Sequence, residues 1–527
     1  MAMRITNSMI TMHSKTNING TKNLTDKYNG QMTSQKKIDK PSDDPVVAIR
    51  SLRLRDSLHE VEQYTDKNIP DAESWLKVTE TSLNNVSNIL KDIYGMCVNG
   101  STGTLTNDDR NVIMSNLSAY VEQIYSEGNT EYAGRTIFTG YKTNKTLTFE
   151  EATDADYNIR QKFDTQNTIT KTFYTGKVEV PKTEAEILSS VISDIVDTSY
   201  DVVKFAYSDI DKVNKVSFKI GNAAPEECDV TGTAVTDPSS GVTYSSANLT
   251  TTTLMTPTNV YTFDNEEDWA AVMGKKEVGD DDIVIIKATG EMVLGSNVGA
   301  TLKQNKAEIA LDYDKTSFVK GEVRPEMLFD CTDSTNPIAP IEYEREVQDI
   351  NYLVAGNQLL NVNTQAGQDG VFSTMIKRDV EDLINAVTRA QAANEDKARI
   401  EAMMKNPLYA SEDDQAKLKD WLNAINKEVT YTTDNLQKLF SQGITRFQDY
   451  KQTVDLAKTD VGSKAKRLEL TKTRVTSQKS SLQELIHSNE DRELSDILID
   501  YETANLAYQS SLKAASEINQ MTLLTYL

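Results

Sequence analysis

The sequence is poor in the side chains on which metal sites and many enzymes depend. It has 3 cysteines and 3 histidines among 527 residues. The cysteines, Cys97, Cys228 and Cys331, are odd in number, far apart and in no CxxC pair, which argues against a disulfide framework and against a zinc site. So few histidines leave little material for His-based catalysis or metal binding. We expect no cofactor, no metal and no enzymatic activity.

Two patterns look like metal-binding motifs but lack essential residues. The run that begins at His59 starts like the HExxH zinc motif, but Gln63 stands where the second histidine ligand belongs. The acidic clusters 264–268 and 280–282 lack the glycine and the spaced final glutamate of an EF-hand calcium loop. We interpret these clusters as solvated acidic turns.

Long apolar runs and an excess of positive charge are also missing. No run approaches the roughly 20 apolar residues of a transmembrane helix. The N-terminal segment lacks the apolar stretch of about 7–15 residues found in a secretory signal peptide. The formal net charge is −23, from 56 Lys and Arg against 79 Asp and Glu, and such a surface disfavours nucleic acid and anionic membranes. We expect no nucleic acid partner, no membrane insertion, and either a cytoplasmic location or export without such a peptide.

Proline and glycine are scarce, at 11 and 23 residues, and unevenly placed. No proline lies between residues 71 and 180 or after Pro407. Because these residues interrupt helices, their distribution predicts a helical N-terminal part, a punctuated centre and a helical C-terminal part. The apolar fraction, 38% against about 45–50% in ordinary globular domains, favours an elongated molecule with narrow cores.

Apolar residues in both helical parts recur at alternating intervals of three and four residues. This heptad pattern keeps one stripe of each helix against a partner helix. In the N-terminal part the stripe is Ile69, Ala72, Leu76, Thr79, Leu83, Val86, Leu90 and Ile93, and a second helix follows from Thr106 to Ile124. In the C-terminal part it is Ile497, Tyr501, Ala504, Tyr508, Ser511, Ala515 and Ile518. On periodicity alone, a bare coiled coil is the simpler interpretation.

The centre of the chain has the alternation that is typical of strands. Residues 215–220 alternate apolar and polar side chains, and residues 283–286 form a short apolar run of the kind found in buried strands. Between Asp229 and Thr258, 14 of 30 residues are Ser or Thr. We interpret that segment as exposed strands and loops, with O-linked modification as the alternative.

These observations predict an α+β fold. The N- and C-terminal arms form an elongated antiparallel helical bundle or coiled coil, and a β-rich domain is inserted between them. We expect residues 1–40 with 490–527 to form a terminal coiled-coil layer. Residues 41–143 with 345–489 form a helical rod domain, and residues 144–344 form a β-rich outer domain.

One basic segment interrupts the acidic sequence. Six cationic side chains stand against Glu469 on a predicted helix, namely Lys464, Lys466, Arg467, Lys472, Arg474 and Lys479. A solvated helix face is the usual explanation, and pairing with an acidic neighbouring subunit is the alternative.

Several segments resemble the bacterial flagellin family. Residues 3–7 are similar to the start of that family. Residues 37–46 resemble its N-terminal helix start, which contains Pro41, Ser42, Asp43, Asp44 and Pro45. Asp44 can cap the following helix, and Pro45 suits its first position because it has no amide hydrogen to leave unpaired. Pro70 departs from the family pattern and predicts either a kink or a helix restart.

Three further segments resemble the hook–filament junction members of this family more than its filament members. The first is a turn with Gly134, Arg135, Phe138 and Gly140. The others are residues 461–469 and the final run 508–515. The helical stretch 380–440 is longer than the resemblance implies.

The resemblance implies a structural role outside the cell. Such a protein joins the hook, through the first hook-associated protein, to the flagellin filament. It forms a ring of identical subunits, and it reaches the hook–filament junction through the flagellar type III export apparatus with the help of an export chaperone, without a cleaved signal peptide. Two alternatives stay open at this point: a filament flagellin, and a cytoplasmic coiled-coil scaffold.

The resemblance also implies that the terminal segments fold fully only when subunits assemble. The stripe on the first helix is weak, because polar residues dilute it, so that helix is marginal by itself. We expect the assembly interface to consist of Ile5, Met9, Met12, Ile497, Tyr501, Ala504, Tyr508, Leu512, Ala515 and Ile518. We expect Ile497, Tyr501, Tyr508 and Ile518 to contact neighbouring subunits more than the core of their own chain.

Overall fold

The computed structural model describes residues 7–38, 40–102, 107–164, 168–174, 178, 180, 186, 195–221, 223–249, 257–274, 276–368 and 370–524. The chain divides into two units. The terminal unit consists of Met1–Glu73, Asn351–Leu360 and Ala465–Leu527, and the central unit of Ser74–Ile350 and Asn361–Lys464. The long helices at both ends of the chain and the strands between them confirm the α+β class. The predicted three-domain division stays a prediction.

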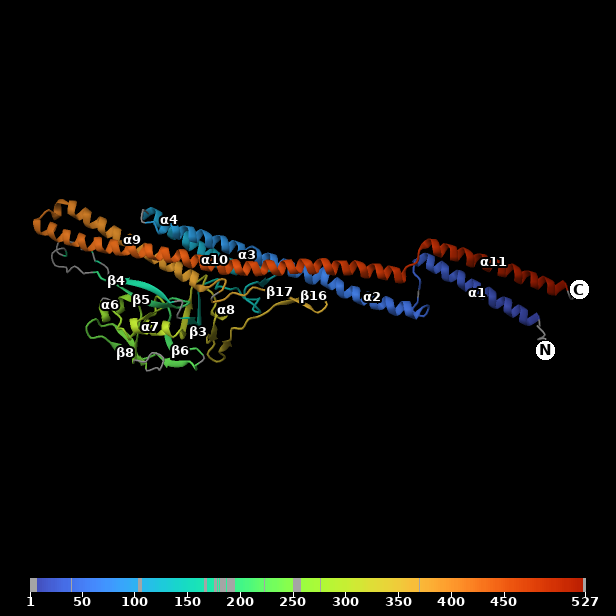
Figure 1. Cartoon of the computed structure of the whole chain (residues 1–527), viewed down its shortest axis with the longest axis horizontal. Coiled ribbons are helices and arrows are strands. Elements are labelled where there is room, and N and C mark those ends of the chain that lie inside the picture. Colours follow the sequence, from blue (N-terminus) through green and yellow to red (C-terminus); the bar gives the residue numbers. More distant parts are fainter. Residues whose placement is uncertain are drawn as a thin grey trace. The chain divides into compact units, whose positions relative to one another are not determined.

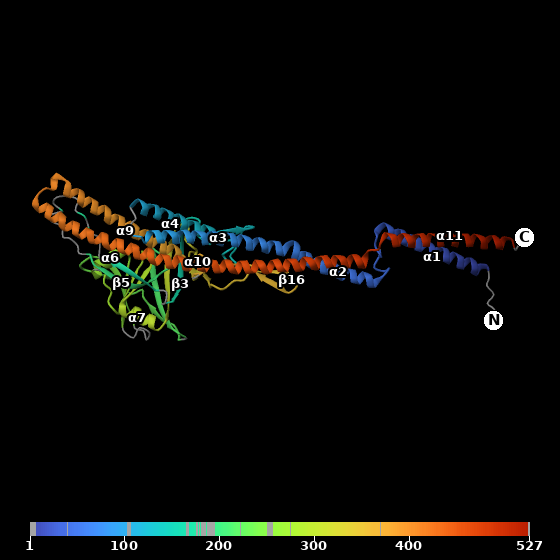
Figure 2. The ribbon, with the colours of Figure 1, turned by 45° about the horizontal axis from the view of Figure 1, so that its top comes forward.

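The terminal unit is built from helices and one small hairpin. Its helices are α1 (Asn7–Ser34), α2 (Pro45–Gln63) and α11 (Leu494–Leu524), with the beginning of α3 (Ile69–Gly100) and the end of α10 (Glu412–Glu490). The hairpin pairs β16 (Asn351–Ala355) with β17 (Gln358–Asn361). Helices α1 and α11 lie side by side (Figures 1 and 2).

A π-helical turn, Tyr64–Asn68, connects α2 to α3 directly before Pro70. Proline cannot donate the backbone hydrogen bond that an uninterrupted α-helix requires at that position. The wider turn accommodates the missing donor, because i→i+5 bonding replaces the regular pattern locally. The chain therefore stays helical from α2 through the π-turn into α3, and of the two outcomes that the sequence left open, a restart after a break is excluded.

In the central unit, four helices pack as antiparallel neighbours. They are α3, α4 (Asn107–Gly128), α9 (Thr374–Lys405) and α10. Ser87 Oγ on α3 donates to Asp455 Oδ1 on α10 at 2.8 Å, and Gln391 Nε2 on α9 donates to Asn111 Oδ1 on α4 at 2.9 Å. Every residue of the predicted stripe from Ile69 to Ile93 is buried. The heptad pattern in this part of the chain is therefore confirmed.

Two sheets form the β-rich part of the central unit. The seven-stranded sheet has the order β4-β5-β12-β11-β10-β9-β8, and only its β10–β11 pair is parallel. Its strands are β4 (Ile169–Tyr174), β5 (Asp197–Lys204), β8 (Thr233–Thr236), β9 (Thr243–Leu249), β10 (Thr258–Phe263), β11 (Ile283–Ile286) and β12 (Glu291–Leu294). The whole of β11 is buried, as its apolar run predicted. Of the Ser/Thr-rich segment, β8 is fully exposed, while residues 250–256 lie outside the described residues.

The six-stranded sheet has the order β15-β14-β3-β13-β6-β7 and is antiparallel throughout. Its strands are β3 (Thr153–Asp164), β6 (Lys212–Ile220), β7 (Glu226–Asp229), β13 (Ala307–Phe318), β14 (Asp330–Asp333) and β15 (Ile341–Tyr343). The short elements are β1 (Glu131–Tyr132), β2 (Arg135–Thr136), α6 (Glu266–Met273), α7 (Ser296–Gln304), α8 (Pro325–Leu328) and the 3₁₀ turn Pro407–Tyr409. Within the described part of the chain, none of the helices combines the length and apolarity needed to cross a bilayer.

Candidate assembly surface

The predicted helix start at residues 41–45 caps α2. Asp44 has an extended backbone, and its carboxylate accepts hydrogen bonds from the amides of Val46 at 3.0 Å and Val47 at 3.2 Å. Pro45 occupies the first turn, where no amide is needed. Asp43 Oδ2 accepts from Lys40 N at 3.0 Å and so closes the turn before the cap. The capping role that the sequence predicts for Asp44 is confirmed, while Pro41 and Ser42 are exposed beside it.

The segment that connects α1 to α2 pairs with the segment that connects α10 to α11. Lys37 N donates to Glu490 O at 2.7 Å, and Arg492 N donates to Gln35 O at 3.0 Å. Between them, Lys36 and Asp491 form an antiparallel bridge. These backbone bonds tie the two ends of the chain together over more than 450 residues of sequence.

The carboxylate of Glu490 is a negative charge that cationic side chains share at this pairing of segments. Its side chain is only 5% exposed, and it accepts from Arg55 Nη2 at 2.6 Å, from Lys36 Nζ at 3.0 Å and from the hydroxyl of Ser51. The hydrogen bonds from Arg55 hold the pKa of the Glu490 carboxyl below its usual value, and Lys36 acts in the same direction. Sequence reasoning missed Glu490, because its partners lie far away along the chain and no spacing pattern marks it.

The predicted interface residues of α11 divide between two faces. Ile497 and Ala504 are buried, and Tyr501, Tyr508 and Ala515 are half-buried, in the helix that lies beside α1. Leu512 is exposed. The C-terminal stripe therefore first serves the pairing of helices within one chain. Its contacts with neighbouring subunits stay a prediction.

The predicted residues of α1 lie away from its half-buried stripe. Met9 and Met12 are exposed, Met12 to 72%. Ile5 lies outside the described residues, as does the side chain of Ile518. From Ile10 to Tyr28, the half-buried residues of α1 are Ile10, Ser14, Ile18, Thr21, Thr25 and Tyr28. Half of this stripe is Ser or Thr, so it contributes little apolar area to the pairing with α11.

Large exposed apolar side chains are concentrated in the terminal unit. This unit holds about a quarter of the chain but more than half of the large hydrophobic residues that are exposed among those the structure describes. We call the helical members of this set the terminal apolar surface. They are Met9, Met12, Leu24, Val46, Ile49, Leu52, Leu470, Leu485, Leu494, Leu498, Ile499, Leu506 and Leu512. Exposed apolar side chains that gather in one part of a protein commonly mark interfaces.

The basic segment of α10 pairs largely within its own chain. In the terminal unit, Lys472 Nζ lies 2.7 Å from Glu73 Oε2, and Lys479 Nζ lies 2.9 Å from Asp66 Oδ2. The hydrogen bond from Lys479 lowers the pKa of the Asp66 carboxyl. In the central unit, Lys464 pairs with Asp460 at 2.8 Å. These pairs favour the solvated helix face over pairing with a neighbouring subunit.

The predicted turn motif forms a tight hairpin in the central unit. Ala133 and Gly134 link β1 to β2 with φ values of 51° and 74°, the positive pair that a two-residue type I′ turn requires. The guanidinium of Arg135 lies 5.1 Å from the centre of the Trp75 ring. Phe138 is fully buried, and its ring packs edge-on against Phe372 at 4.7 Å.

The end of the same motif contacts the returning chain. Gly140 has a φ of 65°, and a Cβ added there would lie 2.5 Å from Gln348 Oε1. That oxygen accepts from Tyr141 N at 2.7 Å, and Phe138 O accepts from Ala366 N at 3.0 Å. The motif is therefore a structural junction between the N-terminal helices and the segment that leads back to α9.

The comparisons with known proteins agree with the resemblance in the sequence. Residues 5–143 match the family model of the bacterial flagellin N-terminal helical region. About a quarter of the chain is therefore similar to that region. The resemblance to the flagellin family that residues 37–46 indicated is therefore confirmed for this part of the chain.

Two curated relatives are both named flagellar hook-associated protein 3. The protein of Escherichia coli strain K12 is 32% identical over 126 residues, which cover 24% of this chain and 39% of that protein. The protein of Salmonella typhimurium strain LT2 is 27% identical over 195 residues, which cover 37% of this chain and 59% of that protein. The chain thus spans about two to three fifths of the length of the curated relatives it matches.

Similar solved structures carry related names. The flagellar junction protein FlgL of Legionella pneumophila has a TM-score of 0.27 and 11% identity, with 85% of this chain and all of that chain covered. FlgL of Xanthomonas campestris has a TM-score of 0.23 and 10% identity, with 81% and 99% covered. Because these TM-scores are below 0.5, the similarity does not establish the architecture of this chain.

Proposed function

We propose that this protein is a structural component of the bacterial flagellum that joins the hook to the flagellin filament. The flagellin N-terminal region and the relatives named hook-associated protein 3 support this role. The observation that carries it is the concentration of exposed apolar side chains in the terminal unit. A non-enzymatic adaptor requires surfaces of this kind, because its only task is to bind its neighbours.

The weak pairing of α1 with α11 suits assembly at a defined place. The stripe of α1 contains Ser14, Thr21 and Thr25, and that of α11 contains Ala504, Ser511 and Ala515. These residues bury little apolar area. Because burial stabilises by about 25 cal/mol per Å² of apolar area, the pairing of the two helices gains little free energy from them. The helix pair gains most of its remaining stability only when neighbouring subunits cover the terminal apolar surface. Subunits then stay dispersed in solution and become ordered on docking.

The partners follow from this role. The terminal apolar surface contacts identical subunits in a ring, the first hook-associated protein on one side and flagellin on the other. Before assembly, an export chaperone covers part of the same surface, and the type III apparatus of the flagellum exports the chain to the outside of the cell. Glu490 and the cap at Asp44 set the geometry at which the helices of the terminal unit meet.

The location of the protein tests this proposal. Antibodies against the chain, applied to purified flagella, should label the hook–filament boundary alone. Label along the whole filament would instead identify a filament flagellin. Label found only inside the cell would identify a cytoplasmic scaffold. Either of these results would contradict the junction role.

The terminal apolar surface is tested by charge substitution. Val46 is 76% exposed on α2, with Ile49 exposed one turn further on. The double variant Val46→Lys, Ile49→Lys should keep monomer helix content but fail to restore filament growth in cells that lack the protein. The control, Ser57→Lys with Gln63→Lys, adds the same charge at exposed polar positions of the same helix and should restore growth. Equal growth with both variants would exclude this face of α2 from the interface.

A further inference from the structure

The long helical stretch 380–440 has a structural counterpart in the hairpin of α9 and α10. In Figure 1 the two helices run side by side, and strands β4 and β5 lie along them in the same unit. Contacts between this hairpin and the β-rich part include two groups, and Arg389 of α9 lies over the ring of Tyr174 at a position between them on the helix. One group is polar and lies in the first turns of α9, and the other is apolar and lies toward the turn between the helices.

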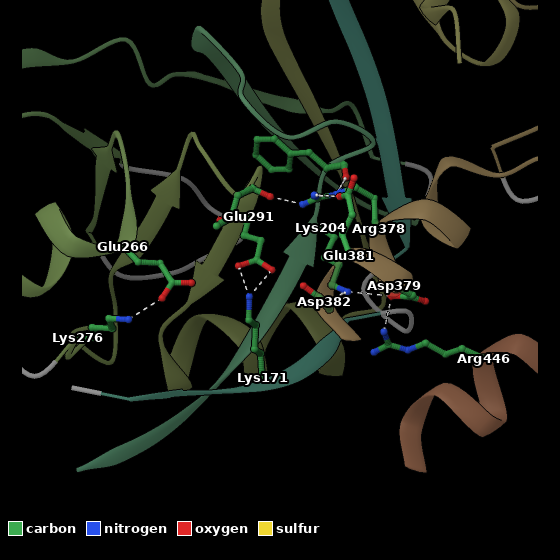
Figure 3. A network of polar contacts seen from close by, with 12 residues as sticks. Lys171, Lys204, Glu266, Lys276, Glu291, Arg378, Asp379, Glu381, Asp382 and Arg446 are labelled. Atoms are coloured by element: carbon green, nitrogen blue, oxygen red, sulfur yellow. Dashed lines mark hydrogen bonds and ion pairs between the residues drawn. The ribbon is translucent and has the colours of Figure 1, made fainter. Parts of the chain in front are cut away.

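The polar contact centres on Asp379 (Figure 3). Lys204, the last residue of β5, places its Nζ 2.8 Å from Asp379 Oδ1 and also pairs with Asp382. The exposed fractions of the two side chains are 2% for Lys204 and 5% for Asp379. From α10, Arg446 Nη1 lies 2.6 Å from Asp379 Oδ1, and Tyr450 donates its hydroxyl hydrogen to Oδ2 at 2.8 Å. One carboxylate thus joins a strand of the sheet to both helices of the hairpin.

Arg378 extends the polar contact from the neighbouring position on α9. Its guanidinium donates to the carbonyl oxygens of Phe205 at 3.3 Å and of Thr289, and it pairs with Glu381 at 2.8 Å. Figure 3 shows that the buried pair Lys171–Glu291 lies next to this group, with a distance of 2.7 Å between Nζ and Oε1. Charged side chains of α9 therefore contact β5 and the chain beside it at several points, and Arg378 and Asp379 among them are nearly withdrawn from solvent.

The apolar contact forms a separate core. Ile400 of α9 and Leu418, Trp421 and Ile425 of α10 pack against Tyr174, Val178, Val180 and Ile195 of the inserted part of the chain. The hydroxyl of Tyr174 also donates to Tyr431 O at 2.8 Å, and Val178 N donates to Glu428 Oε2 at 3.1 Å. Asp379 and Ile400 are separated on α9 by about 30 Å at the usual rise of 1.5 Å per residue.

Two attachments so far apart resist rotation as well as separation. A single contact would leave the sheet free to pivot, whereas a second contact at the far end of a stiff helix pair removes that freedom. We infer that the α9–α10 hairpin is a two-point brace that holds the β-rich part of the central unit in one orientation on the helices. Asp379 is the positioning residue at the polar end, because Lys204 of the sheet and Arg446 and Tyr450 of α10 all contact its carboxylate.

The brace is tested by breaking each end separately. Asp379→Asn removes one of the two carboxylates that compensate Lys204, and it also removes the partner of Arg446. Breaking a largely buried pair in this way is destabilising. Amide exchange in β4 and β5 should become at least about 100-fold faster, while exchange in the stripe of α3 stays unchanged. Leu418→Ala, at the apolar end, should accelerate exchange in β4 alone. The control Lys219→Met breaks the exposed pair with Glu308 in the same part of the chain and should change neither.

A distance measurement tests orientation directly. Spin labels at the exposed positions Thr236 of β8 and Val112 of α4, in a Cys228→Ser background, report how the sheet lies on the helices. The double variant Asp379→Asn, Leu418→Ala should broaden the distance distribution, and Lys219→Met should not. An unchanged distribution would overturn the proposal. Faster amide exchange in α3 of the Asp379→Asn variant would also overturn it. That result would show that the network around Asp379 stabilises the whole unit and not the attachment of the sheet alone.

Discussion

Single residues in this protein decide how segments distant in sequence meet. Gly140 and Glu490 act in opposite ways: Gly140 leaves room for a neighbour, and Glu490 supplies a charge that several neighbours need. Neither residue belongs to a periodic pattern. Each is explained by the group that lies against it in the folded chain, Gln348 in one case and the Arg55 and Lys36 pair in the other.

Gly140 should be less tolerant of substitution than Gly134, although both have a positive φ. Gly140→Ala adds a collision with Gln348 to the backbone strain, whereas a Cβ at Gly134 meets open space. We expect Gly134→Ala to destabilise the fold by about 1–2 kcal/mol through backbone strain alone. Gly140→Ala should cost roughly 1 kcal/mol more, because Gln348 would shift and lose its hydrogen bond from Tyr141 N. Chemical denaturation of the two variants checks this, and equal costs would show that Gln348 moves aside freely.

At the scale of elements, α11 has one apolar face that is buried beside α1 and an adjacent apolar face that is exposed. Ile497 is buried beside α1, and the next residue, Leu498, is exposed. The heptad pattern identified the first face, because that face repeats with the period of the helix. The spacing of the leucines beside it does not show whether they widen the buried stripe or stay exposed, so only the structure identifies them as exposed.

This division predicts opposite effects for neighbouring substitutions. Ile497→Ala should loosen the α1–α11 pair in the free monomer, at a cost of about 2–4 kcal/mol for that pairing, and should accelerate amide exchange in α1. Leu498→Ala should leave monomer exchange unchanged but weaken incorporation at hook ends. Both variants are compared by exchange and by filament growth. Faster monomer exchange with Leu498→Ala would contradict the assignment of its face.

At the scale of the whole molecule, each unit contains a buried carboxylate that is surrounded by cationic side chains, and the stability of the unit depends on its negative charge. The pKa of Glu490 is lowered chiefly by the hydrogen bonds from Arg55. Burial raises the pKa of Asp379, but the charges of Lys204 and Arg446 outweigh this and bring it below its usual value. Both units are therefore built to hold these groups charged at neutral pH.

The lowered pKa values set the sign of the pH dependence. A carboxyl that titrates lower in the folded chain stabilises the fold above its unfolded pKa, about 3.9 for Asp and 4.3 for Glu, and this contribution is lost as pH falls through the folded value. Stability should thus be level from pH 8 to about 5 and fall below about 4.5. Thermal unfolding as a function of pH tests this, with Glu490→Gln flattening the acid slope. A loss of stability between pH 7 and 6 would contradict it.

The sequence by itself determined the helical arms, the β-rich centre, the cap at Asp44 and the buried stripe of α3. All of these follow from local causes: the period of a helix, the scarcity of proline and the geometry of one turn. The tertiary structure alone decided that Asp379 meets Lys204, that Glu490 meets Arg55 and Lys36, and which leucines of α11 stay exposed. Such contacts join residues that are far apart along the chain, and charged side chains of this kind are too common in so acidic a sequence for any spacing to single them out.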